Sequence, residues 1–138
     1  MKTPLAFLSY DFKLSEDERA RFVNEITTSS KAFAVDDWSS ERKAPREDWD
    51  KLVHSKIGRA DFVIVLVAEG MDLGPVAIEL QEARRCNVPF FGVYVGGAKA
   101  GTTLPEGLGA NRTIPWDWDR IATAIEQVTR EGKHHVFR

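Results

Sequence analysis

The segment from Gly74 to Asn87 places a glutamate at the edge of an apolar helical stripe. At about 100° per residue, that stripe is formed by Val76, Leu80 and Ala83. Glu79 lies about 60° from Val76, on the flank of the stripe. A carboxylate held there, partly desolvated beside a cleft, could bind ribose hydroxyls or stabilise positive charge at a sugar carbon. Cleavage of a glycosidic bond passes through such an oxocarbenium-like state.

Two structural roles for Glu79 remain open on spacing alone. It could cap its own helix, or pair with Arg84 or Arg85. The helix is predicted over 75–87 with a proline in its first position, so the glutamate is expected one turn in, with support from the helix dipole. Glu82 lies further round the helix and is expected to be more solvated.

Polar residues also follow the first predicted strand. Ser9, Tyr10 and Asp11 could contact a ribose or a phosphate, or simply form the turn out of the strand.

The second predicted strand is followed by another polar group. Asp37, Trp38 and Ser39 could line the same rim. Trp38 could stack on a base or plug the sheet edge, and Asp37 could cap a turn.

The chain alternates apolar and amphipathic runs, which predicts a parallel α/β sheet. Strands are expected over 4–10, 31–38, 61–67, 88–95 and 112–115, and helices over 15–28, 45–60, 75–87 and 116–130. Five strands favour the order 2-1-3-4-5, in which ligands bind beyond the carboxyl ends of strands 1 and 3. Glu79 would lie beside that crevice.

Chain length, net charge and residue content exclude several classes of function. The 138 residues fit a single domain over 1–138, and a net charge of −2 argues against broad contact with nucleic acid. No segment approaches the roughly 20 apolar residues of a membrane span, so a soluble, cytoplasmic protein is expected. Cys86 is the single cysteine, and His54 stands apart from the adjacent pair His134 and His135. Neither a disulfide nor a metal site is therefore expected.

Three segments together resemble the bacterial TIR-like family, which includes the TIR proteins of Thoeris anti-phage systems. They are "AFLSYDF", "FAVDDWSSERKAPREDW" and "IGRADFVIVLVAEGMDLGPVAIELQEARRCNVPFFGVY", with a weaker match in "IPWDWDRI". The resemblance implies a flavodoxin-like (TIR-like) three-layer sandwich. It also implies cleavage of the nicotinamide glycosidic bond of NAD, by a glycohydrolase or an ADP-ribosyl cyclase, and a cyclic or conjugated ADP-ribose-derived nucleotide that signals to an effector protein. NAD is then a substrate, and self-association is implied.

The resemblance assigns roles to particular residues. Glu79 takes the place of the catalytic glutamate, and two groups border the substrate: Ser9, Tyr10 and Asp11 after strand 1, and Asp37, Trp38 and Ser39 after strand 2. One departure is that many TIR enzymes carry a tryptophan four residues before the glutamate, where this chain has Pro75.

Two other interpretations remain open. The pattern from Asp72 through Gly74 and Glu79 to Ala83 is similar to the nucleoside deoxyribosyltransferases, in which a glutamate attacks the sugar carbon. A non-catalytic TIR domain that acts through assembly is also compatible with Pro75.

Overall fold

The computed structural model describes residues 5–11, 16–28, 34–36 and 46–131 of the chain. Its elements are β1 (Leu5–Ser9), α1 (Glu16–Thr28), β2 (Ala34–Asp36), α2 (Arg46–Arg59), β3 (Phe62–Val67), α3 (Leu73–Arg85), β4 (Phe90–Tyr94), η2 (Ala110–Arg112), β5 (Thr113–Pro115) and α4 (Trp118–Glu131). Within these ranges, no helix has both the length and the apolar character that a bilayer span requires.

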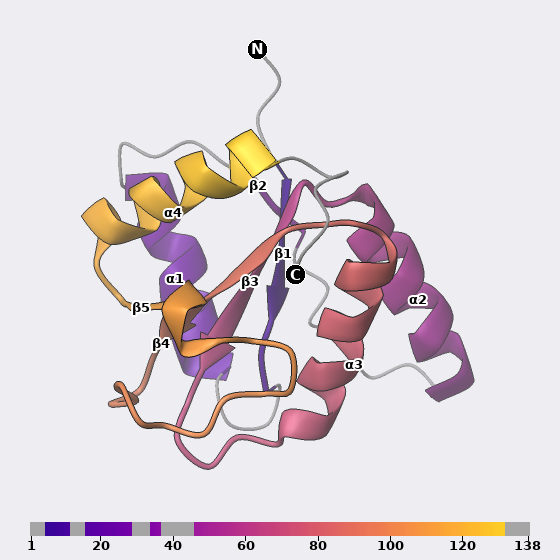
Figure 1. The fold of residues 1–138 in the computed structure, drawn as a ribbon, viewed down its shortest axis with the longest axis horizontal. Helices are drawn as coiled ribbons and strands as arrows, with labels where there is room; N and C mark the ends of the chain where they lie inside the picture. The colour runs from indigo at the N-terminus through magenta and orange to yellow at the C-terminus, as the bar shows by residue number, and fades with distance from the viewer. Residues whose placement is uncertain (1–4, 12–15, 29–33, 37–45, 132–138) are drawn as a thin grey trace.

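The sheet is parallel, with its strands in the order β2-β1-β3-β4-β5. The chain runs outward from β1 to β2 and then returns across β1 to β3, so the direction of winding reverses between β1 and β3. Figure 1 shows α2 and α3 on one side of the sheet and α1 and α4 on the other. The parallel α/β architecture expected from the sequence is confirmed.

The centre of the core is β3, because it is paired with β1 on one edge and β4 on the other. All six of its residues are buried. Its sequence FVIVLV has no polar break, as expected for a strand covered by helices on both faces. Its β-branched side chains also suit the extended backbone.

The start of α3 differs from the sequence prediction. The helix begins at Leu73, and the side chain of Asp72 caps it by accepting a hydrogen bond of 3.1 Å from the Gly74 backbone N–H. Pro75 is therefore the third helical residue and not the first. Its missing N–H is still tolerated there, because N–H groups of the first turn have no partner within the helix.

The other end of α3 is closed by backbone bonds. Asn87 adopts a left-handed conformation with φ of 56°, and its N–H donates to the Arg84 carbonyl. The Val88 N–H then donates to the Ala83 carbonyl at 2.8 Å. Such an ending satisfies carbonyls of the last turn and redirects the chain into β4.

Two tryptophans fix α4 against α1. The Trp116 and Trp118 indole N–H groups both donate to one carboxylate oxygen of Glu25, at 3.0 and 2.7 Å. At the start of α4, Asp117 accepts a hydrogen bond from the Asp119 N–H. The segment therefore forms a capped helix start that two aromatic side chains anchor to α1.

One glycine in β4 has no room for a side chain. A Cβ on Gly92 would lie 2.9 Å from Leu108 Cδ2 and 3.1 Å from Thr113 Oγ1. We expect Gly92→Ala to lower the free energy of unfolding by about 1–3 kcal/mol because of overpacking. The control is Gly58→Ala in α2, where no heavy atom lies within 4 Å. That change should raise the free energy of unfolding by about 0.5–1 kcal/mol. If urea denaturation gave the same change in unfolding free energy for both variants, the close packing around Gly92 would be contradicted.

Candidate active site

A hydroxyl and a carboxylate meet inside the protein, at the position where the winding reverses. Ser9 is the last residue of β1 and lies opposite Val65 of β3. Its Oγ donates a hydrogen bond of 2.5 Å to Glu79 Oε1 on α3. Both residues have an exposed fraction of 0%. Two residues that the sequence assigned to one site are thus in direct contact.

The surroundings of Glu79 differ from those predicted. The sequence placed it on the flank of the apolar stripe, but the structure buries it completely together with the stripe residues Val76 and Leu80. Since α3 begins at Leu73, Glu79 is in the second turn, where the helix dipole has largely faded. A carboxylate buried in this way is costly unless hydrogen bonds compensate it, and Ser9 supplies one.

The arginine pairing that the sequence left open is not the arrangement found around Glu79. Arg84 donates to the Gly107 carbonyl at 2.9 Å, and Arg85 donates to Glu82 at 3.2 Å. The observed hydrogen bond of Glu79 instead connects α3 to the sheet.

The two residues after Ser9 take different positions. Tyr10 is buried in the core, with an exposed fraction of 1%. Asp11 is partly exposed, and its carboxylate accepts a hydrogen bond of 2.8 Å from the backbone N–H of Asp72. This bond joins the segment after β1 to the segment after β3. The predicted site residues Asp37, Trp38 and Ser39 lie outside the described residues.

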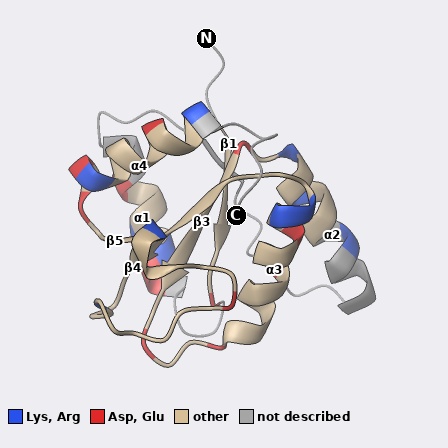
Figure 2. Cartoon of the chain, in the orientation of Figure 1, with Lys and Arg blue, Asp and Glu red and all other residues tan. Residues whose placement is uncertain are grey.

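Charge is distributed unevenly between the two ends of the sheet. Figure 2 shows acidic residues on the loops beyond the carboxyl ends of the strands and basic residues on the last turns of α2 and α3. Asp11, Glu69 and Asp72 belong to the acidic end. Glu69 also accepts a hydrogen bond of 2.5 Å from Thr102, which ties the loop after β4 to the end of β3. These three carboxylates favour a cationic group near the loops after β1 and β3, whereas the loop after β4 at the same end carries Lys99.

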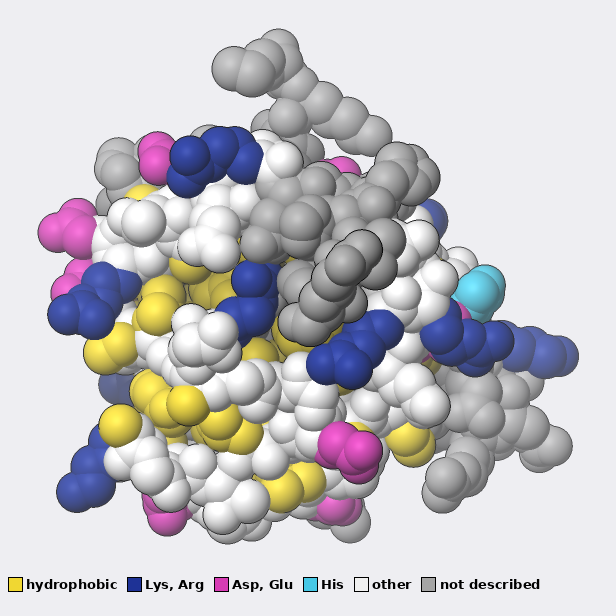
Figure 3. Space-filling view, in the orientation of Figure 1, with side chains coloured by type: hydrophobic (Ala, Val, Ile, Leu, Met, Phe, Trp, Pro, Cys, Tyr) yellow, Lys and Arg dark blue, Asp and Glu magenta, His cyan; other side chains and the backbone are white. Residues whose placement is uncertain are grey.

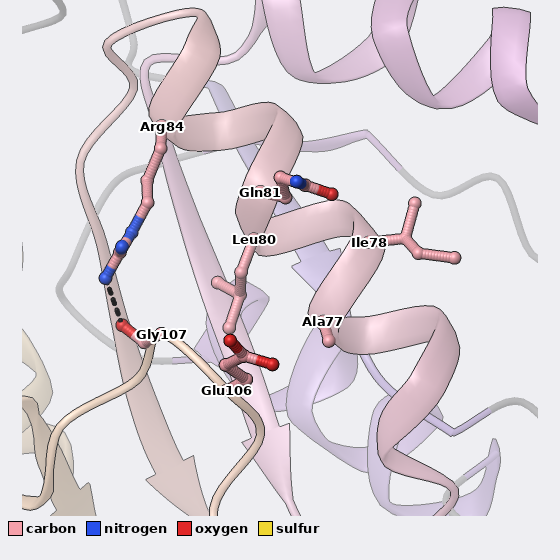
Figure 4. Close-up of a pocket in the computed structure, with 7 residues that line it drawn as sticks. All are labelled: Ala77, Ile78, Leu80, Gln81, Arg84, Glu106 and Gly107. Atoms are coloured by element: carbon pink, nitrogen blue, oxygen red, sulfur yellow. Dashed lines mark hydrogen bonds between the residues drawn. The ribbon is translucent and has the colours of Figure 1, made fainter.

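Two of the cavities formed by described residues lie near α3 and beyond β4 and β5, and neither of these two is lined by Glu79. One of about 230 Å³ lies along α3, where Arg84 reaches across to Gly107 (Figure 4). It falls below the roughly 300–1,000 Å³ of ligand pockets. The other, of about 320 Å³, lies beyond β4 and β5 and is lined by Tyr94, Lys99 and Trp116 among others. Figure 3 shows apolar side chains gathered on the face formed by the loop after β4 and by β5.

A second polar cluster was missed by the sequence reasoning. His54 of α2 shares a hydrogen bond with Glu82 of α3, and the Cys86 thiol donates to the same Glu82 oxygen at 3.8 Å. His54 therefore does not stand alone. Glu82 is 9% exposed and not solvated as predicted, because α2 packs against its side of α3. The i, i+4 spacing of Glu82 and Cys86 was the signal available in the sequence.

Comparisons with known proteins support the fold only. No family model matches the chain, and no curated protein matches it. Among solved structures, a crystal structure of a prokaryotic SEFIR domain is similar with a TM-score of 0.56. The identity is 16%, and the match covers 93% of this chain and 91% of that one. This likeness shows that the chain has a TIR-like α/β fold.

The Ser9–Glu79 contact predicts opposite effects for single and paired substitutions. Ser9→Ala removes a donor to a buried carboxylate, so it should lower the free energy of unfolding by about 1–3 kcal/mol. The double variant Ser9→Ala, Glu79→Met removes the carboxylate as well, and it should recover most of that loss. Denaturant unfolding of the four members of this double-mutant cycle provides the measurement. If the double variant lost as much unfolding free energy as the two single variants together, the two side chains would not be coupled.

Proposed function

We propose that this chain is a TIR-like enzyme that cleaves the nicotinamide N-glycosidic bond of NAD, with Glu79 as the catalytic carboxylate. The observation that carries the proposal is the Ser9–Glu79 hydrogen bond at the reversal between β1 and β3. In doubly wound sheets, ligands bind beyond the carboxyl ends of the strands at this point. The resemblance of the Glu79 segment to TIR-like sequences supports the same residue.

The chemistry requires a group that stabilises positive charge at the ribose. When the bond from C1′ to the nicotinamide nitrogen breaks, its electron pair goes to the ring, which becomes neutral. The ribose is left as an oxocarbenium-like cation, which the Glu79 carboxylate stabilises electrostatically. Water, a group of the same ADP-ribosyl unit or a hydroxyl of a second nucleotide then attacks C1′ and releases its proton to solvent. Ser9 holds the carboxylate in one orientation through its hydrogen bond, and so acts as a positioning residue.

The acidic end of the sheet suits this substrate in one respect. The nicotinamide ring of NAD carries a positive charge, and Asp11 and Asp72 lie on the loops that flank the reversal. Their carboxylates also suit hydrogen bonds from ribose hydroxyls. We include Asp37, Trp38 and Ser39 in the proposed substrate site on the basis of the sequence.

Because Glu79 is completely buried, the proposed activity requires a conformational change that exposes its carboxylate. With an exposed fraction of 0%, its carboxylate meets a substrate only after the covering residues have moved. A resting chain is then inactive, and a trigger or self-association is needed to open the site. The product of the open form would be an ADP-ribose-derived nucleotide that signals to an effector in anti-phage defence.

The decisive experiment measures nicotinamide release from NAD by mass-resolved chromatography. Concentrated protein is tested alone and with lysate of phage-infected cells, and Glu79→Gln is expected to release at least about 100-fold less nicotinamide than the wild type. The amide keeps an acceptor for Ser9, so the variant should unfold at the same temperature or higher. Lost activity with retained stability would separate a catalytic role from a structural one.

The matched control is Glu126→Gln, an exposed carboxylate on α4, across the sheet from α3. It should leave nicotinamide release unchanged. A folded wild type that leaves NAD intact under every condition would overturn the proposal. Base exchange between deoxynucleosides without nicotinamide release would reassign the site to a nucleoside transferase.

A second candidate is a non-catalytic assembly domain, which the complete burial of Glu79 favours. In that case Glu79 has a structural role, in which its hydrogen bond with Ser9 joins α3 to β1, and the protein acts by self-association. Its mass, measured by light scattering, should rise with concentration equally in the wild type and in Glu79→Gln. A strict monomer across the accessible concentrations would exclude this function.

A further inference from the structure

A set of metal-ligating side chains lies between α2 and α3, outside the proposed active site. His54 Nδ1, a Glu82 carboxylate oxygen and Cys86 Sγ all lie within 4.8 Å of one another. His54 lies in α2, Glu82 lies in α3 and Cys86 is the C-cap of α3, so the packing of the two helices assembles the cluster. We propose that His54, Glu82 and Cys86 bind a divalent ion of the zinc class, which bridges α2 and α3.

Two of the ligand atoms lie against the third. The same oxygen, Glu82 Oε1, is bonded by both His54 Nδ1 and Cys86 Sγ. In a tetrahedral zinc site with bonds of 2.0–2.3 Å, an oxygen and a sulfur ligand lie about 3.6 Å apart. The observed separation of Sγ from Oε1 is 3.8 Å, close to that value. The His54 nitrogen is closer to Oε1 than a shared metal allows, so the ring must swing outward when an ion enters.

The surroundings allow that movement while they hold the carboxylate in place. The His54 side chain is 69% exposed, whereas that of Glu82 is 11% exposed. Arg85 Nη1 donates to the other oxygen, Glu82 Oε2, at 3.2 Å. This bond leaves Oε1 directed at the histidine and the cysteine. Charged groups around a metal site commonly orient its ligands in this way.

The ligand set selects the kind of ion. Imidazole and thiolate ligands favour zinc and similar transition metals, whereas magnesium and calcium prefer oxygen ligands alone. Three protein ligands leave a fourth position for water, on the solvent side where His54 is exposed. Binding would release the Cys86 thiol proton, because the thiolate is the ligand, so affinity should fall as the pH is lowered.

Cobalt binding to the full, reduced chain tests the proposal directly. Co²⁺ is added without oxygen, and the absorption band of a thiolate-to-cobalt transition is followed to saturation. We expect one ion per chain, displacement of Co²⁺ by Zn²⁺, and no competition from Mg²⁺. The absence of a thiolate band would overturn the proposal, because Cys86 is the single cysteine.

Variants separate this site from adventitious binding. Cys86→Ser should abolish the band, and His54→Gln, at an exposed position, should weaken binding at least about 10-fold. The control removes the other two histidines together, His134→Ala with His135→Ala, and should bind as the wild type does. Wild-type affinity in His54→Gln, or loss of binding in the double variant, would refute the assigned ligands.

A thermal measurement provides an independent readout. Zn²⁺ at saturating concentration should raise the Tm of the wild type, because it binds the folded chain preferentially. It should not raise the Tm of Cys86→Ser. The inference does not depend on the proposed NAD chemistry, so Glu79→Gln should keep the zinc effect. An equal shift in the wild type and in Cys86→Ser would contradict a bridging ion at this cluster.

Discussion

A carboxylate enclosed by a parallel sheet and its helices must find its hydrogen-bond donors inside the protein. For Glu79, one donor is the hydroxyl of Ser9 at the end of β1. This bond constrains three features together: the end of β1, the rotation of α3 and the point where the winding reverses. An apolar residue would pack there at lower cost. The presence of a buried polar pair in such a position is the physical reason to look for function in it.

The fold by itself does not decide between catalysis and assembly, since one architecture serves many chemistries. The likeness to a SEFIR domain extends over nearly the whole chain, yet at 16% identity it concerns the backbone path only. What separates the two functions is whether the interior around Glu79 opens. The bond between Asp11 and Asp72 is relevant here, because it holds together the two loops that would have to part.

Much of the fold followed from local patterns, whereas contacts between helices did not. The buried run of β3 and the strand–helix alternation were sufficient to predict a parallel sheet. The start of α3 was misjudged because proline is tolerated anywhere in a first turn, and the cap was Asp72. The burial of Glu82 was missed because a helical wheel shows one helix alone, and the covering residue, His54, belongs to α2. The meeting of Ser9 with Glu79 was anticipated only to the extent that both were assigned to one crevice.

Glu79 and Glu82 have a mechanical consequence for α3. The two carboxylates are about 60° apart around the helix axis, one bonded to β1 and the other to α2. A helix held only by apolar contacts can roll slightly and exchange one packing for another. Here a rotation of α3 about its own axis would break at least one of these two hydrogen bonds. Contacts with β1 and with α2 therefore hold the helix in one rotational position. A motion that separates α3 from the end of β1 is therefore expected to move α3 and α2 together.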